Sequence, residues 1–250
     1  MAPELRQPRR RKQRSRLFGP AAFLIICAAA VFSMSIFFRV STVEIQGESR
    51  YSDEEIQDAA GIEKGSNLFF INTFSAGNRI LSKLSYIESA AITRHPPGRV
   101  VIEIVESRPL AYVTIDSECW LIDRHCKLLE KTTTAGAAPY IRVLALTPIA
   151  PMVGEIIAPG EAEMPKVTYL AELLSGLEAW NMTKDVSEID TGNVANPSFR
   201  YQGRFTVRMG GKEEVSYKLE LLLSAVSQLA AGDSGTLDLS VDKRVSFSPD

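Results

Sequence analysis

The sequence predicts an α+β protein with a single N-terminal transmembrane helix, a small βααββ domain and a larger, mostly antiparallel β domain that carries two helices. Three observations predict this class. A long uncharged run follows a basic tail, the next segment shows one strand, two helices and two strands, and the remainder shows mainly strand-like alternation. With 250 residues, 45% of them hydrophobic, the chain is long enough for two modest cores.

The N-terminus combines a basic tail with an apolar span. Residues 1–16 carry seven basic side chains against Glu4, so the tail has a charge of +6 and the rest of the chain −8. Residues 17–38, LFGPAAFLIICAAAVFSMSIFF, carry no charge. At ~1.5 Å per residue a helix of this length extends about 33 Å, enough to cross the apolar core of a bilayer. The charge asymmetry predicts a single-pass cell-membrane protein with a cytoplasmic N-terminus and residues 40–250 on the far side.

Other interpretations of the N-terminus fit these residues less well. A cleaved signal peptide would have an apolar region of about 7–15 residues and a small-residue site, for which residues 28–30 could serve. The apolar run continues through VFSMSIFF, however, so cleavage there would leave an apolar new N-terminus. Ile26 is not the small residue expected before a lipid-modified Cys27. The basic cluster could contact phosphates, but beside a span it is typically an orientation signal, so no nucleic-acid partner is expected.

The first part of the small domain shows a strand and a short helix. Val43 and Ile45 alternate with polar neighbours, as in a half-buried strand. Ser52 and Glu55 fit a capping box, which predicts a helix over 53–60 that ends at Gly61.

The second part of the small domain shows a helix and a hairpin. Asn72 can cap a helix whose apolar face is predicted to comprise Phe74, Ile80, Leu81 and Leu84. Residues 87–94 are extended, HPPG makes a turn, and 99–107 alternate with three apolar side chains on one face, those of Val100, Ile102 and Ile104. Two helices on one face of three strands complete a small domain over 40–108.

Residues 109–250 predict the larger domain. Pro109 marks its start, because proline has no N–H to offer to a strand ladder. Residues 111–131 predict a β-hairpin with its turn near 123–126. Residues 132–165 are rich in Thr, Ala, Pro and Gly, which predicts loops and edge strands. Helices are expected at 167–180 and 214–231, and strands at 186–190, 198–202 and 205–209. A final pair of strands follows from Gly235.

Cysteines and histidines are few. Cys119 and Cys126 would face an oxidising compartment, and their spacing is compatible with a disulfide. Two neighbouring strands can equally hold unpaired cysteines, so both states stay open. With only His95 and His125, and no CxxC or HExxH motif, no metal site is expected.

The sequence offers little support for catalysis. His95 and His125 both fall in predicted turns, where a polar turn residue is the ordinary interpretation. Glu103 and Glu106 lie on opposite faces of their strand and cannot act as a pair from it. GxxxxGK[ST], GxGxxG and GxSxG are absent. We therefore expect no enzyme, no cofactor and no small-molecule substrate. The alternative of an exported cell-wall hydrolase predicts that changing either histidine abolishes activity.

Binding through a strand edge is the remaining chemistry. The chain ends in an alternating strand, 244–248, which could leave unpaired N–H and C=O groups that accept a strand from another protein. The same pattern also fits an internal strand.

The order of motifs resembles the FtsQ/DivIB family of bacterial cell-division proteins. VSTVEIQG, GIEKGSNLFFI and LSKLSYIESAAITRHPPGRVVIEIVESRPLAYV are similar to that family's POTRA domain. WLIDRHCKLLE resembles its hairpin, usually ending in Asp-x-x-Gly-x-Leu, although Cys126 stands where glycine is frequent. VRMGGKEEVSYKLELL resembles the start of a family helix, and GTLDLSVDKRVSFSP its last two strands. The resemblance covers nearly the entire chain.

The resemblance implies a non-enzymatic scaffold of the divisome at the division septum. Such proteins join FtsL-like and FtsB/DivIC-like single-span partners, together with other divisome proteins, and through them govern septal peptidoglycan synthesis. In the family the last strands form the docking edge. Carried over by position, the partner-binding residues are Ser240, Val241, Arg244, Val245, Ser246 and Phe247. Phe247 is the expected buried anchor, since aromatic residues dominate interface energetics. A POTRA-bearing protein-transport or assembly component is the alternative.

Overall fold

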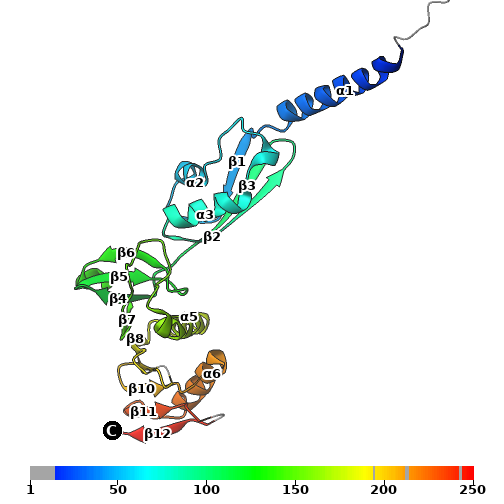
Figure 1. Ribbon diagram of the computed structural model, residues 1–250. Coiled ribbons are helices and arrows are strands. Elements are labelled where there is room, and N and C mark those ends of the chain that lie inside the picture. The colour runs from blue at the N-terminus through cyan, green and yellow to red at the C-terminus, as the bar shows by residue number, and fades with distance from the viewer. Residues whose placement is uncertain (1–14, 194, 212–213, 242–243) are drawn as a thin grey trace, which may run out of the picture.

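The computed structural model describes residues 15–193, 195–211, 214–241 and 244–250. A helix, a three-stranded sheet and a nine-stranded sheet follow one another along an extended molecule (Figure 1). Two sheets with helices packed on them make this an α+β protein. Residues 1–14 of the predicted basic tail, which spans residues 1–16, lie outside the described residues.

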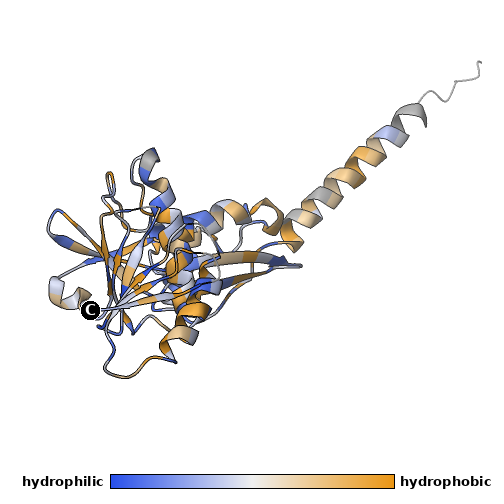
Figure 2. Cartoon of the chain, turned by 90° about the horizontal axis from the view of Figure 1, so that it is seen from below, coloured by the Kyte–Doolittle hydropathy of each residue, from blue (hydrophilic) through white to orange (hydrophobic). Residues whose placement is uncertain are grey.

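Helix α1, Ser15–Phe37, stands apart from both sheets in Figure 1, and Figure 2 colours most of it as hydrophobic. The side chains of Phe23, Leu24 and Ile25 are about two thirds exposed, at 67%, 67% and 68%. Counted over the described residues, no helix has both the length and the hydropathy that crossing a membrane requires.

The three-stranded sheet has the order β1-β3-β2. Strand β1 pairs in parallel with β3, and β2 pairs antiparallel with β3. Along the chain the elements are β1 Thr42–Gln46, α2 Asp53–Ala60, η1 Leu68–Phe70, α3 Thr73–Lys83, β2 Ile87–His95 and β3 Arg99–Glu106. The predicted core face of β3 is confirmed, because Val100, Ile102 and Ile104 are buried in the cluster that the two helices cover.

Local capping chemistry fixes the ends of these helices. Ser52 and Glu55 form the predicted capping box, and Gly61 ends α2 with φ +63°. Asn72 caps α3 by accepting from Ser75 N–H at 3.0 Å. The predicted apolar face of α3 is wrong at Phe74, which is 76% exposed.

The reason for the difference lies in the rotation of α3. Its buried residues are Ala76, Gly77 and Ile80. Phe74 lies in the first turn, roughly 110° around the helix from the middle of this buried face, so its side chain does not point at the core. Gly77 is the point of closest approach, where a Cβ would lie 3.1 Å from the carbonyl oxygen of Ala90 in β2.

The nine-stranded sheet has the order β12-β11-β10-β9-β8-β7-β4-β5-β6. Its strands are β4 Ala111–Ile115, β5 Glu118–Ile122, β6 Leu128–Thr132, β7 Ile141–Leu144, β8 Val186–Asp190, β9 Ser198–Tyr201, β10 Phe205–Arg208, β11 Gly235–Asp238 and β12 Ser246–Pro249. The helices are α4 Thr134–Ala137, η2 Glu161–Glu163, α5 Met164–Ala179 and α6 Val215–Val226. Apolar side chains of α5 and α6 share one core with the sheet.

Five of the eight neighbouring strand pairs in this sheet are antiparallel, as predicted, but the sheet is mixed. Three neighbouring pairs run in parallel: β4 with β7, β7 with β8, and β10 with β11. Helices α5 and α6 lie in the connections to β8 and β11 and return the chain in the same direction, as parallel pairs require. Strand β7 consequently lies inside the sheet, although residues 132–165 were predicted to supply only loops and edge strands.

The two cysteines of the hairpin do not form a disulfide. Cys119 and Cys126 are both free and buried. Cys119 packs with Leu121 and Leu129 on one side, whereas Cys126 belongs to the main core of the nine-stranded sheet. Residues 119 and 121 of β5 face one side of the sheet, and residues 120 and 122 the other. The two thiols therefore lie in separate clusters.

Candidate functional site

The β5–β6 turn forms one polar cluster, at the junction between the two sheets. The carboxylate of Asp123 is buried, and it accepts hydrogen bonds from Ser107 Oγ at 2.9 Å, His125 N–H at 2.8 Å and Lys127 N–H at 2.9 Å. Ser107 follows the last strand of the small sheet, so this carboxylate ties the turn to both parts of the chain.

Lys127 makes a second tie across the junction. Its Nζ donates to the carbonyl oxygens of Leu81 at 3.1 Å and Ile87 at 2.8 Å, both in the small domain. Burial lowers the pKa of Lys127, and the charge of Asp123 partly offsets this. The amine is therefore held by hydrogen bonds to two carbonyl oxygens in a partly buried environment.

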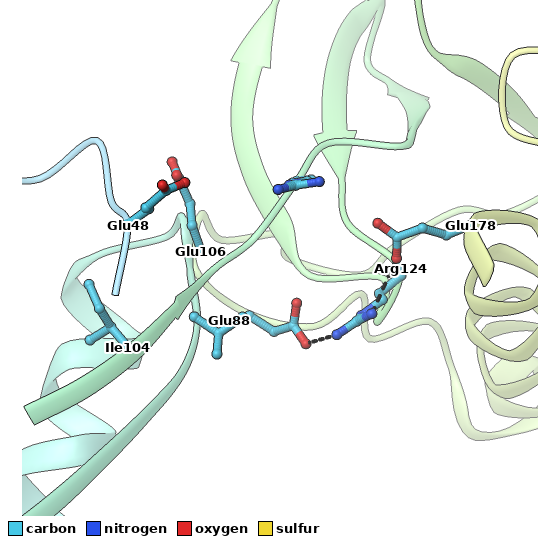
Figure 3. Close-up of a pocket in the computed structure, with 8 residues that line it drawn as sticks. Glu48, Glu88, Ile104, Glu106, Arg124 and Glu178 are labelled. Carbon is cyan, nitrogen blue, oxygen red and sulfur yellow. Dashed lines mark hydrogen bonds and ion pairs between the residues drawn. The ribbon is translucent and has the colours of Figure 1, made fainter. Parts of the chain in front are cut away.

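Arg124 links three elements, as Figure 3 shows. Its guanidinium is hydrogen-bonded to Glu88 of β2 and lies 3.2 Å from Glu178 Oε2 of α5. His125 Nε2 is 3.1 Å from the same Glu88 carboxylate. Burial opposes the charged form of Glu88, but the contacts from Arg124 and His125 outweigh it and lower the pKa of Glu88. The prediction of His125 as a plain turn residue therefore missed its role at the junction.

A cavity of about 400 Å³ opens beside this network (Figure 3). It is lined by Glu48, Glu88, Ile104, Val105, Glu106, Arg108, Arg124 and Glu178. Glu106 pairs with Arg50 at 3.1 Å, and two further carboxylates pair with Arg124 as above. Of these ion pairs, that of Arg124 with Glu88 joins the two domains. The lining residues include no serine, cysteine or histidine that could act as a nucleophile.

Histidine and metal chemistry find no support elsewhere in the described chain. His95 is exposed at the end of β2, with Nε2 3.1 Å from Thr93 Oγ1. Glu103 is exposed on β3, as a solvated strand residue should be. Over the described ranges, no group of three His, Cys, Asp or Glu side chains could hold a metal ion.

The opposite end of the large sheet presents an edge. Among the described residues β12 pairs with β11 alone, and Phe247 stands opposite Leu237. Asp250 N–H donates to Ser234 oxygen at 3.2 Å, which continues the same register. Because hydrogen-bonded and non-bonded pairs alternate in antiparallel strands, the N–H and C=O of Phe247 point away from β11.

A groove of about 330 Å³ lies beside this edge, between α6 and the last two strands. It is lined by Leu221, Ser224, Ala225, Gln228, Leu229, Leu237, Val245 and Phe247. The half-buried ring of Phe247 meets the ring of Phe205 edge to face, with centroids 6.1 Å apart. Phe247 therefore contributes its side chain to the groove wall and its backbone to the strand edge.

Of the other predicted partner-binding residues, only Val245 lines this groove. Ser240 N–H donates to Asp238 Oδ1 at 2.8 Å, and the hydrogen bonds from Ser240 lower the pKa of Asp238. Val241 is 59% exposed. Arg244 and Ser246 are exposed as well. The structure thus brings Val245 and Phe247 together in the groove, and Ser240, Val241, Arg244 and Ser246 are not among its lining residues. Residues 242–243 lie outside the described residues.

Sequence reasoning missed the α6 side of the groove. The signal was present in the consecutive leucines 221–223, which exceed what one buried helix face can accommodate. Leu222 is buried, whereas Leu221 is half-buried and lines the groove. The pairing of Glu88 with Arg124 had no local signal, because the two residues lie 36 positions apart.

Comparison with known proteins places the chain in context. A family model described as "POTRA domain, FtsQ-type" matches residues 38–107. The cell division protein DivIB of Clostridium tetani is 26% identical over 192 residues, which cover 77% of this chain and 71% of that relative. DivIB of Clostridium botulinum is 24% identical over 238 residues, 94% of this chain and 91% of the relative. The cell division protein FtsQ of Corynebacterium glutamicum is 23% identical over 94 residues, 36% of this chain and 42% of the relative.

Proposed function

We propose that this chain, as a member of the FtsQ/DivIB family of cell-division proteins, is a non-enzymatic membrane scaffold of the divisome. In this proposal it binds FtsL-like and FtsB/DivIC-like partners at the septum and through them helps to control septal peptidoglycan synthesis. The observation that carries the proposal is the open edge of β12 beside an apolar groove.

The edge and the groove suit a partner strand in complementary ways. The outward N–H and C=O of Phe247 can extend the ladder by one strand, which gives affinity, and the groove can take alternate side chains of that strand, which gives selectivity. Pro249 faces the same way two residues later but has no N–H to offer. Pairing is therefore expected to centre on Phe247, and in this proposal Ser240, Val241 and Arg244 also contact the partner.

The proposal includes the membrane anchor, and it rests on the uncharged run of residues 17–38 in the full sequence. Helix α1 has 23 residues, a length of about 35 Å at ~1.5 Å per residue, compared with about 30 Å for the apolar core of a bilayer. The charge asymmetry of the sequence supports a cytoplasmic N-terminus, with the POTRA-like domain of residues 40–108 and the β domain of residues 109–250 on the outer side.

Site-specific crosslinking in dividing cells tests the docking edge. A photoreactive residue is placed in turn at each described position from 240 to 248, and at Lys131 on the opposite edge strand as a control. We expect adducts with an FtsB/DivIC-like protein from 245 and 247 and none from 131. Adducts of equal yield from 131 would contradict the edge, and the absence of division-protein adducts at every position would contradict the scaffold function.

A further inference from the structure

Four exposed phenylalanines gather where α1 meets the small domain. Phe37, Phe69, Phe70 and Phe74 are 66%, 49%, 87% and 76% exposed, and we call them the aromatic patch. A single exposed aromatic side chain is ordinary, but large apolar side chains that cluster on a surface mark an interaction site.

The patch is held against the end of α1. The ring of Phe38 lies 5.2 Å from that of Phe37 and 4.9 Å from that of Phe69, both edge to face. Leu68 N–H also donates to the carbonyl oxygen of Phe38 at 2.8 Å, and Val40 N–H to that of Ser66 at 2.8 Å. These backbone bonds fix the segment that carries Phe69 and Phe70 relative to the end of the helix.

Arginine side chains border the patch. Arg39 is exposed and pairs through its backbone with Asn67. Arg94 is also exposed, and its Nη2 donates to the carbonyl oxygen of Ile71 at 2.6 Å. Exposed aromatic rings next to cationic side chains match the boundary between acyl chains and anionic headgroups.

We propose that the aromatic patch inserts into the outer interface of the membrane and seats the small domain on the lipid surface. The inference rests on the proposed anchoring of α1, because a helix about 35 Å long that spans a 30 Å core brings its last residues to the interface. The ring centroids of Phe37 and Phe69 lie about 5 Å from that of Phe38, just after that end, and Phe70 follows Phe69 directly. These rings therefore fall in a boundary layer that apolar side chains enter by about 5–10 Å. The bilayer is then the occupant that covers the patch, and it fixes the orientation of both sheets above the membrane.

The test uses the full chain in nanodiscs of phosphatidylethanolamine and phosphatidylglycerol, with no other protein present. Cys27→Ala removes the thiol within α1, while Cys119 and Cys126 are buried and shielded from labelling. An environment-sensitive dye is attached in separate variants at Phe70→Cys, at Ile25→Cys within α1, and at Tyr217→Cys on α6 as the water-exposed control.

We expect a lipid-borne quencher to reduce the dye signal several-fold more at 70 than at 217. If 25 is quenched and 70 matches 217, the anchor stands and the interfacial patch is refuted. If 25 is also unquenched, the anchor itself fails and the inference falls with it. Shielding of 70 that appears only after an FtsL-like helix is added would make the patch a protein-docking surface and would overturn the proposal.

A pair of substitutions separates insertion from general folding effects. A dye at Lys64→Cys, on the exposed loop before Phe69 and Phe70, is quenched when the small domain lies on the lipid surface. This quenching is measured while Phe70 and Phe74 are substituted together. Two glutamates are expected to abolish the quenching at 64, and two leucines to preserve it, because leucine remains apolar. Equal quenching in both double variants would overturn the inference.

Discussion

The two edge strands of the nine-stranded sheet differ in whether their outward backbone groups are hydrogen-bonded. At the β6 edge, Leu128 N–H donates to the carbonyl oxygen of Glu155 at 2.8 Å, and its own carbonyl oxygen accepts from Gly154 N–H at 2.7 Å. At the β12 edge, the corresponding groups of Phe247 point outward beside an apolar groove. Unpaired strand edges invite association, so proteins usually cover them. The difference teaches that this chain covers the start of β6, near the junction of its domains, and leaves exposed the edge that we propose for a partner.

The edges also differ in what their side chains do. The turn that leads into β6 carries Asp123, Arg124 and Lys127, all of which bind groups outside the turn. Around β12 the side chains of Arg244, Ser246 and Ser248 are exposed. Substitutions near β6 should therefore change folding stability, and substitutions at β12 should change partner affinity.

The largest effect is expected from Asp123→Ala at the β6 end. It removes three hydrogen bonds and the charge that offsets the burial of Lys127, so we expect the free energy of unfolding to fall by about 3 kcal/mol. Urea denaturation of the full chain in detergent measures the change. Asp58→Ala, on the exposed side of α2, is the control and should cost at most ~0.5 kcal/mol. Similar losses in the two variants would show that the junction is not a special point of stability.

The next largest effect is expected from Phe247→Glu at the β12 end. A buried interface anchor is worth about 2 kcal/mol or more, so affinity for an FtsB/DivIC-like partner should fall at least ~30-fold. The control is Ser248→Glu, which places the same charge one residue away on the opposite face of the strand. Titration of the labelled partner measures both. An unchanged affinity for Phe247→Glu, or an equal loss in the two variants, would contradict the account of this edge.

The smallest effect is the pH dependence of the junction. The pKa of Glu88 is lower in the folded protein than its ordinary value of 4.5. Its contribution to stability is therefore fully present above about pH 4.5 and is lost as the pH falls through the lowered pKa. Thermal unfolding at a series of pH values should show a steeper decline below pH 4.5 for the original chain than for Glu88→Gln. Parallel declines would mean that this carboxylate does not couple the two sheets.

The features predicted correctly from the sequence depend on contacts between near neighbours. The Ser52 and Glu55 capping box, the end of α2 at Gly61 and the hairpin of β2 with β3 all lie within short segments. The features missed depend on distant pairing. Strand β7 is internal because β4 and β8 flank it, and no local pattern in residues 132–165 records those neighbours. The groove likewise forms only where α6 and β12 meet. The sequence therefore identified Phe247 as a candidate partner-binding residue but not the residues of α6 that line the groove with it.

Amide hydrogen exchange at Phe247 tests the central claim most directly, with Leu128 as the matched position at the covered edge. We predict that the Phe247 amide exchanges rapidly in the free protein and becomes strongly protected when an FtsB/DivIC-like partner binds, whereas the Leu128 amide is protected in both states. Slow exchange of Phe247 in the free chain, or no gain in protection on binding, would contradict the account.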